Sequence, residues 1–160
     1  MSWYVRNVRE LKWWDVGPRG FVAELVEDEK LQVGVNLFVL EPGNPMSMYH
    51  WEADQEGFLV LSGEAVLIVE DEERTLRQWD YFHCPIGVPH TIVGAAAGPS
   101  AILAIGGREH QAGDGWGGYP YSEVAMKHDA STEQETTKAA IAYARFPDGE
   151  ETEFREDWLP

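Results

Sequence analysis

The sequence predicts an all-β domain, a sandwich or barrel of short antiparallel strands. Short runs rich in β-branched and aromatic residues recur along the chain, and glycine, proline and acidic turns separate them. Helical patterns are confined to the region after residue 118. With 160 residues, of which 44% are hydrophobic and 12% aromatic, the chain is long enough to bury one core of its own.

The first twenty residues are irregular and aromatic, and they end at the breaker Gly17-Pro18-Arg19-Gly20. Residues 21–26 alternate, 27–30 form a charged turn, and 32–40 form a strong strand that Pro42-Gly43-Asn44-Pro45 ends. The further expected elements are extended segments at 46–52 and 57–61, a tight turn at Ser62-Gly63, an acidic turn at 70–73, and strands at 65–69, 74–78, 81–84, 91–93 and 101–105.

The composition changes after the last of these strands. Residues 106–118 carry six glycines, and the pattern beyond them predicts short helices over 123–128 and 138–145. Ser122 is the expected cap of the first helix, and Thr136 or Thr137 that of the second. We therefore divide a single domain into an N-terminal segment (1–20), a barrel (21–112), and a part made of a glycine-rich loop, short helices and an acidic tail (113–160), with Phe154 and Trp158 as docking anchors.

Charge and cysteine content limit the partners and the compartment. Twenty-eight acidic residues against twelve basic ones give a formal net charge of −16, which repels nucleic acids and anionic membranes. The single Cys84 excludes an internal disulfide and fits a reducing compartment. The chain shows no signal-peptide pattern and no apolar run of membrane-spanning length, so we expect a cytoplasmic protein.

One segment concentrates metal-binding chemistry. Side chains alternate along an extended strand, so His50, Glu52, Asp54 and Glu56 are expected on one face. A second imidazole, His90, follows a proline- and glycine-rich stretch. Two imidazoles with carboxylates are a donor set that can hold a divalent ion with open coordination positions.

Residues 41–94 resemble the cupin superfamily, because they contain its two sequence motifs in the same order. The matching residues are His50, Glu56 and Gly63 in the first motif, and Asp80, Pro85, Gly87 and His90 in the second. The chain also resembles small bacterial cupin-domain proteins, through Met48-Tyr49-His50, Gln55-Glu56 and His83-Cys84-Pro85. The resemblance implies an antiparallel jelly-roll β-barrel with a short C-terminal helical appendage, a metal centre and a homodimer.

The chain departs from the cupin pattern at four points. The spacer between Gly43 and His50 has six residues rather than five, Trp79 replaces a glycine, and Gly94 replaces an asparagine. These changes concern turn geometry, whereas Glu52 stands where the second histidine of the first motif belongs.

The resemblance and the residue types together predict the metal ligands His50, Glu52, Glu56 and His90. If Glu52 turns aside, His50, Glu56 and His90 remain as a two-histidine, one-carboxylate set. The oxygen-rich mixture favours Fe(II) or Mn(II), with Zn(II) or Ni(II) as alternatives. A cupin that has lost its metal through Glu52 is the opposing interpretation.

The alternation of side chains along a strand also predicts which residues lie on the same face as His50. Met46, Met48, Phe58 and Val60 share the parity of His50, so they either line a substrate pocket beside the metal or pack in the core. Tyr49 and Trp51 would then face outward, against the N-terminal segment or a second subunit.

Two neighbouring residues and one loop have alternative interpretations. His83 could replace Glu52 as a ligand if it faced inward, and Cys84 is expected to be a buried thiol rather than a nucleophile. The loop 113–118 lacks the G-x-G-x-x-G spacing of nucleotide-binding sites, and we expect it to cover the cavity mouth.

These observations favour a metal-dependent enzyme of the oxygenase, decarboxylase or isomerase type that acts on a small organic molecule. Because cupin barrels host many activities, the sequence assigns no catalytic residue. The alternative is a non-enzymatic module that binds or senses a small ligand such as a sugar.

Overall fold

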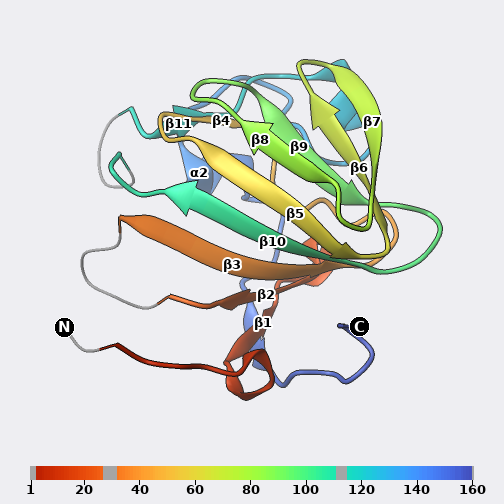
Figure 1. The fold of residues 1–160 in the computed structure, drawn as a ribbon. Coiled ribbons are helices and arrows are strands. Elements are labelled where there is room, and N and C mark those ends of the chain that lie inside the picture. The colour runs from red at the N-terminus through yellow and green to blue at the C-terminus, as the bar shows by residue number, and fades with distance from the viewer. Residues whose placement is uncertain (1–2, 27–31, 111–114, 160) are drawn as a thin grey trace.

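The computed structural model describes residues 3–26, 32–110 and 115–159, and its regular elements are mainly strands (Figure 1). The predicted charged turn at 27–30 and residues 113–114 of the glycine-rich loop lie outside the described residues. The elements are η1 (Val8–Glu10), β1 (Trp13–Asp15), η2 (Gly17–Arg19), β2 (Phe21–Glu24), β3 (Val33–Leu40), β4 (Trp51–Glu52), β5 (Glu56–Ser62), β6 (Glu64–Val69), β7 (Glu72–Arg77), β8 (Tyr81–Cys84), β9 (His90–Gly94), β10 (Ser100–Gly107), β11 (Gly117–Gly118), α1 (Glu123–Met126), α2 (Ala139–Ala142) and β12 (Glu150–Thr152).

The strands form antiparallel sheets, which confirms the all-β jelly-roll prediction. The larger sheet has the order β12-β1-β2-β3-β10-β5-β8, and a three-stranded sheet has the order β7-β6-β9. The short strands β4 and β11 pair with each other. Figure 1 shows β3, β10 and β5 running side by side as the long central strands, with β6, β7 and β9 on the opposite side of the barrel.

The main hydrophobic cluster contains side chains of both sheets. Val60 on β5 and Ile102 on β10 contribute from the larger sheet, and Leu67 on β6 and Ile92 on β9 contribute from the smaller one. All four are at most 3% exposed. Burial of aliphatic side chains from two sheets is the main force that holds a jelly roll together.

The chain termini cover the outer face of β1 and β2. Trp158 lies with its ring centroid 4.8 Å from that of Trp13 and 4.4 Å from that of Phe21. Phe154 contacts the same cluster, so both predicted anchors dock on the barrel. The N-terminal segment is more regular than expected, because it contains β1 and two turns of 3₁₀ helix.

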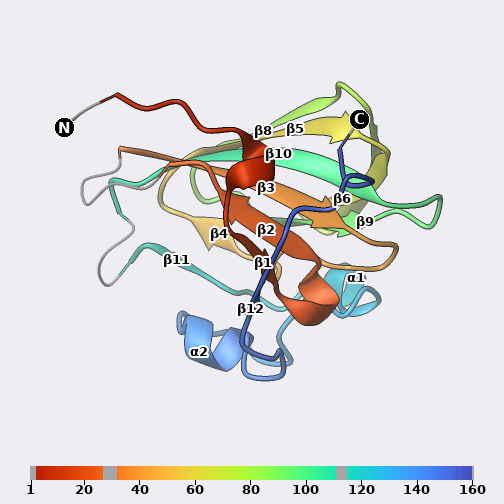
Figure 2. The ribbon, with the colours of Figure 1, turned by 90° about the horizontal axis from the view of Figure 1, so that it is seen from below.

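The C-terminal part packs on the barrel as two short helices, which Figure 2 shows on the same side as β11. Ser122 caps α1 by accepting a hydrogen bond from the backbone of Ala125, as predicted. α2 begins after Lys138 without a side-chain cap, and Thr136 instead accepts from the backbone nitrogen of Lys138. Tyr49 is buried in a cluster with Ala125, so the chain's own C-terminal part covers this aromatic residue rather than the N-terminal segment or a second subunit.

Two departures from the cupin pattern have visible consequences. Trp79 adopts a left-handed backbone conformation with φ +73°, the geometry that a glycine there would adopt without strain. At Gly94 a Cβ atom would lie 2.1 Å from the backbone oxygen of Glu41, so close packing excludes any side chain.

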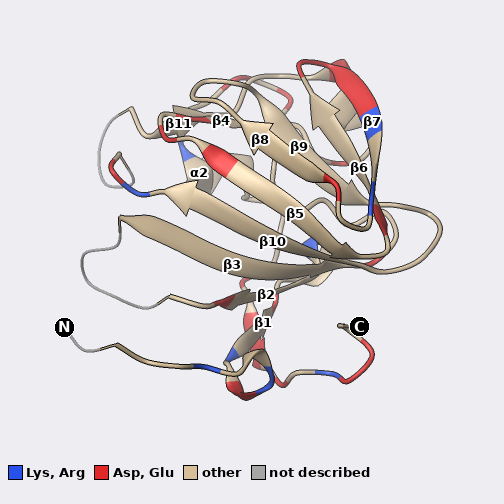
Figure 3. Ribbon diagram, in the orientation of Figure 1, with Lys and Arg blue, Asp and Glu red and all other residues tan. Residues whose placement is uncertain are grey.

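Acidic residues are spread over the surface, with red segments on β7 and along both terminal segments in Figure 3. Among the described residues, no helix is long and apolar enough to cross a bilayer.

Candidate metal centre

Two histidines face each other across a pair of backbone hydrogen bonds. The backbone nitrogen of His50 donates to the oxygen of His90 at 3.1 Å, and that of His90 donates to the oxygen of His50 at 2.8 Å. Their rings are 5.0 Å apart, and His50 and His90 are only 7% and 0% exposed. The segment before β4 and the start of β9 therefore hold both imidazoles in one buried place.

Backbone carbonyls orient both rings. Nδ1 of His50 lies 2.8 Å from the oxygen of Met48, and Nδ1 of His90 lies 3.1 Å from the oxygen of Val88. A carbonyl only accepts, so in the neutral rings each Nδ1 carries the proton and each Nε2 keeps its lone pair. This tautomer is the one that presents Nε2 to a metal ion.

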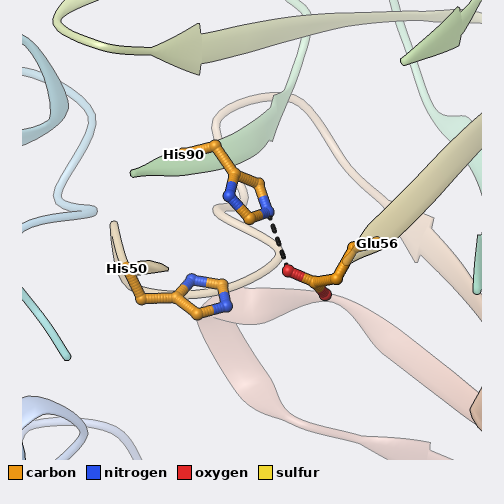
Figure 4. Close-up of side chains that lie close together, drawn as sticks. All are labelled: His50, Glu56 and His90. Carbon is orange, nitrogen blue, oxygen red and sulfur yellow. Dashed lines mark ion pairs between the residues drawn. The ribbon is translucent and has the colours of Figure 1, made fainter. Parts of the chain in front are cut away.

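Glu56 completes the group from the first position of β5 (Figure 4). One ligand atom each of His50, Glu56 and His90 can be chosen so that all lie within 4.8 Å of one another. Oε2 of Glu56 lies 3.3 Å from Nε2 of His90, and these side chains are 13% and 1% exposed. Two neighbouring segments and the more distant strand β9 thus bring two nitrogens and a carboxylate together.

The carboxylate of Glu56 is held in its charged form. Burial would raise the pKa of Glu56, but electrostatic interactions with His90, His50 and Arg108 outweigh it and lower the pKa. Oε2 of Glu56 and Nε2 of His90 nevertheless have no hydrogen-bond partner of acceptable geometry among the described residues. Two buried polar atoms that face each other in this way fit a cation between them.

Glu52 lies on the same side as His50, as strand alternation predicts, whereas Asp54 does not. Oε1 of Glu52 lies 3.4 Å from Nε2 of His50, so this carboxylate adjoins the three-residue group without belonging to it. Asp54 turns away and accepts two hydrogen bonds from His110, at 2.8 and 2.9 Å. The alternation fails because β4 ends at Glu52 and a bend occupies the residues before β5.

The donor set fits a divalent first-row ion. Nitrogen and oxygen ligands lie about 2.0–2.2 Å from such an ion, so two adjacent ligands are roughly 3.0–3.4 Å apart. The His90–Glu56 and His50–Glu52 pairs, at 3.3 and 3.4 Å, match this spacing. Two neutral imidazoles with two carboxylates would also neutralise the ion's charge.

A cavity of about 210 Å³ opens beside this group. Met46 and Phe58, two of the predicted pocket residues, line it. Met48 packs instead with Tyr119 and the C-terminal part, and Val60 lies in the main core. Strand alternation does not place Met48 correctly, because the segment before β4 is irregular rather than one strand.

Small residues on β3 and β10 make room for the cavity. Gly106 of β10 lies opposite Gly34 of β3 on one side and opposite Glu56 of β5 on the other. Two residues earlier on β10, Ala104 lies between Asn36 of β3 and Phe58 of β5, and all three residues line the cavity. The central strand thus has almost no side-chain volume where its neighbours carry polar and aromatic groups.

Comparison with known families and structures agrees with this architecture. The model of a family described as "Cupin domain" matches residues 36–115, half of the chain. The chain belongs to the cupin family. Comparison with curated protein sequences gave no match.

Solved structures show the same fold. A cupin 2 conserved barrel domain protein from Salinispora arenicola is 17% identical with a TM-score of 0.55, over 68% of this cupin and 92% of that chain. The polyketide cyclase RemF from Streptomyces resistomycificus is 16% identical with a TM-score of 0.56, over 66% and 80%. A sugar phosphate isomerase from Silicibacter pomeroyi is 29% identical with a TM-score of 0.49, over 54% of this cupin and 59% of that chain, which is less than two thirds of its length.

In strand β8 of this cupin, His83 and Cys84 face opposite sides. His83 is exposed, and Cys84 is buried with Sγ 3.2 Å from Nδ1 of His90. His83 therefore cannot replace Glu52 as a ligand. Burial and the charges of Glu56 and Glu52 raise the pKa of Cys84 to about 12, which keeps the thiol protonated.

Several cavity residues were not singled out from the sequence, and Arg19, Arg108 and Tyr143 are the most polar of the large ones. Arg108 lies two positions after Gly106, so the alternation of side chains along β10 predicts that both residues face the cavity. Arg19 belongs to η2 and Tyr143 follows α2, both outside the central strands, and no local pattern indicates that they reach the cavity.

Proposed function

We propose that this cupin is a mononuclear metal-dependent enzyme that acts on a small organic molecule in the cavity. His50, Glu56 and His90 would hold the ion, with Glu52 beside it as a fourth ligand. Support comes mainly from the buried Nε2 of His90 and Oε2 of Glu56, which face each other without a hydrogen-bond partner among the described residues. A divalent ion would satisfy both atoms at once.

The residue types favour Fe(II) or Mn(II), because two imidazoles with a carboxylate and open positions suit these ions. A bound ion of this kind polarises substrate oxygens or supports dioxygen chemistry. Glu52, which lies at the edge of the group and also lines the cavity, is suited to accept a proton from a bound substrate when it leaves the ion. The reaction type within the enzyme class is left open by these residues.

The cavity is suited to a small ligand of mixed polarity. Phe38, Met46 and Phe58 provide apolar surface, while Asn36 and Ser47 provide polar groups. Tyr143 closes the lining from the C-terminal part, and its hydroxyl accepts a hydrogen bond from the backbone nitrogen of Met48 at 3.2 Å. The C-terminal part therefore contributes to the site.

Metal analysis of protein purified without a histidine tag tests the proposal. We expect one divalent ion per chain, and a loss of at least about 100-fold in metal affinity in His50→Ala, His90→Ala and Glu56→Gln. His83→Ala is the matched control, because it removes an exposed histidine from the neighbouring strand β8. Unchanged metal content in Glu56→Gln, or an equal loss in His83→Ala, would show that the ligand assignment is wrong.

A non-enzymatic binding module is the second candidate, because the 3.3 Å contact between His90 and Glu56 also suits an ion pair without metal. In that case the protein contains no stoichiometric metal. The same metal analysis separates the two functions.

A further inference from the structure

Two arginines line the same cavity, although the chain carries only twelve basic residues against twenty-eight acidic ones. Arg19 ends η2, and Arg108 follows β10 by one residue. Arg9, Lys12, Arg74, Arg77 and Arg145 each pair with a carboxylate. Within the described part of the chain, neither Arg19 nor Arg108 has a carboxylate oxygen within 4.0 Å.

Aromatic rings of the C-terminal part hold Arg19 in place. Its guanidinium carbon lies 4.8 Å from the ring centroid of Tyr143 and 5.5 Å from that of Phe146. Its Nε is buried and has no hydrogen-bond partner among the described residues. A buried donor on a charged group is costly when unpaired, so this N–H indicates a missing acceptor.

Two glycines leave the space that the Arg108 guanidinium occupies. A Cβ atom at Gly34 would lie 2.4–2.6 Å from three atoms of the guanidinium, and one at Gly106 would lie 3.4 Å from Nη1. Gly34 and Gly106 pair across β3 and β10, and Gly106 also lies opposite Glu56. The absent side chains thus let Arg108 lie across the sheet toward the metal-binding end of the cavity.

The charges of the cavity do not balance without a ligand. A divalent ion would be neutralised by Glu52 and Glu56, which leaves the positive charges of Arg19 and Arg108 in excess. This excess occurs in a protein whose net charge is −16. A cavity of about 210 Å³ admits only a small molecule.

We infer that the ligand is a small oxyanion-bearing molecule, a carboxylate or a phosphate ester, whose anionic group contacts Arg19 and Arg108. This inference rests on the proposed function for the rest of the molecule, which would place its neutral oxygens toward the ion. Guanidinium groups bind carboxylate and phosphate through charge-assisted hydrogen bonds, and stacking on Tyr143 preorganises Arg19 for this role.

Isothermal titration calorimetry of the purified protein tests the inference with succinate, inorganic phosphate and the neutral 1,4-butanediol as probes. We expect at least one anion to bind and butanediol not to bind. Arg19→Met and Arg108→Met should each weaken anion binding by roughly 10–100-fold. Arg155→Met is the control, because Arg155 stacks on Phe21 and Trp158 outside the cavity.

Gly34→Ala is an independent variant that keeps every charge. The three atoms nearest to its Cβ all belong to the flexible end of the Arg108 side chain, so we expect weaker anion binding with an unchanged fold by circular dichroism. Arg19→Lys should restore part of the affinity lost in Arg19→Met. A stronger response to succinate indicates a carboxylate ligand, and a stronger response to phosphate indicates a phosphate ester.

Equal binding of butanediol and the anions would overturn the inference, as would anion binding that Arg19→Met and Arg108→Met leave unchanged. Its failure is distinguishable from failure of the proposed function. Arginine-dependent anion binding by a protein without metal contradicts the enzyme alone, whereas stoichiometric metal without arginine-dependent anion binding contradicts this inference alone.

Discussion

Gly94 provides a direct test of how this chain departs from the cupin pattern. Replacing it with asparagine would install the residue that the pattern has at this position. In the structure the new Cβ would lie 2.1 Å from the oxygen of Glu41 and 2.9 Å from its carbonyl carbon. These are backbone atoms, so the clash is relieved only by moving the turn after β3 away from β9.

The expected loss of stability follows from the contacts that this movement disturbs. Gly43 donates to the oxygen of Gly94, and Gly94 donates to the oxygen of Asn44, both at 2.9 Å. Each hydrogen bond contributes about 0.5–1.5 kcal/mol, and overpacking costs about 1–3 kcal/mol. We therefore expect Gly94→Asn to lower the free energy of unfolding by about 2–6 kcal/mol.

Urea unfolding followed by tryptophan fluorescence measures this change, and a thermal scan should show a Tm lowered by about 2–4 °C for each kcal/mol. Gly43→Ala is the control in the same turn. Gly43 has φ +82° and open space where a Cβ atom would lie, so only the left-handed backbone costs about 1–2 kcal/mol. A Gly94→Asn protein as stable as Gly43→Ala, or more so, would refute the steric argument.

Three further predictions concern the proposed metal centre and the Cys84 thiol beside it. Glu52→Gln should lower metal affinity by about 10–100-fold in a competition titration with a chromophoric chelator, and Glu56→Gln should lower it more; equal effects would contradict their different positions. The buried Cys84 thiol, with its pKa raised from 9.0 to about 12, should react slowly with iodoacetamide at pH 8 in the folded protein and rapidly in urea. Because the folded state disfavours the thiolate, this group should reduce the free energy of unfolding progressively as the pH rises from about 9 toward 12. Rapid labelling of the folded protein at pH 8 would show that the thiol is accessible.

Most strands were predictable because alternation with a period of two directly reflects one buried face. The positions of His50, Glu56 and His90 followed from the spacing of two motifs, and the structure brings these side chains together. Alternation was misleading only where the strand is interrupted. The bend before β5 sends Asp54 to His110, and alternation across it could not show this.

The cavity walls were harder to predict, because they depend on contacts between distant segments. Met48 shares the parity of His50 and was expected either in the cavity or in the core, and it packs in a buried cluster with the C-terminal part. The volume of the cavity follows from the pairing of Gly34 with Gly106 and of Asn36 with Ala104. That pairing is a matter of register between strands, which a single sequence does not specify.

The residues proposed to hold the ion and two residues of the proposed anion site lie in different parts of the chain. His50, Glu56 and His90 all lie within the residues 36–115 that match the cupin family. Arg19 and Tyr143, which stack on each other in the cavity wall, lie outside that range on opposite sides. Substitutions in the segments before and after the barrel are therefore expected to alter anion binding through Arg19 and Tyr143 without touching the proposed metal ligands. Cupins that share the metal-binding pattern with this chain are expected to differ most in these two segments.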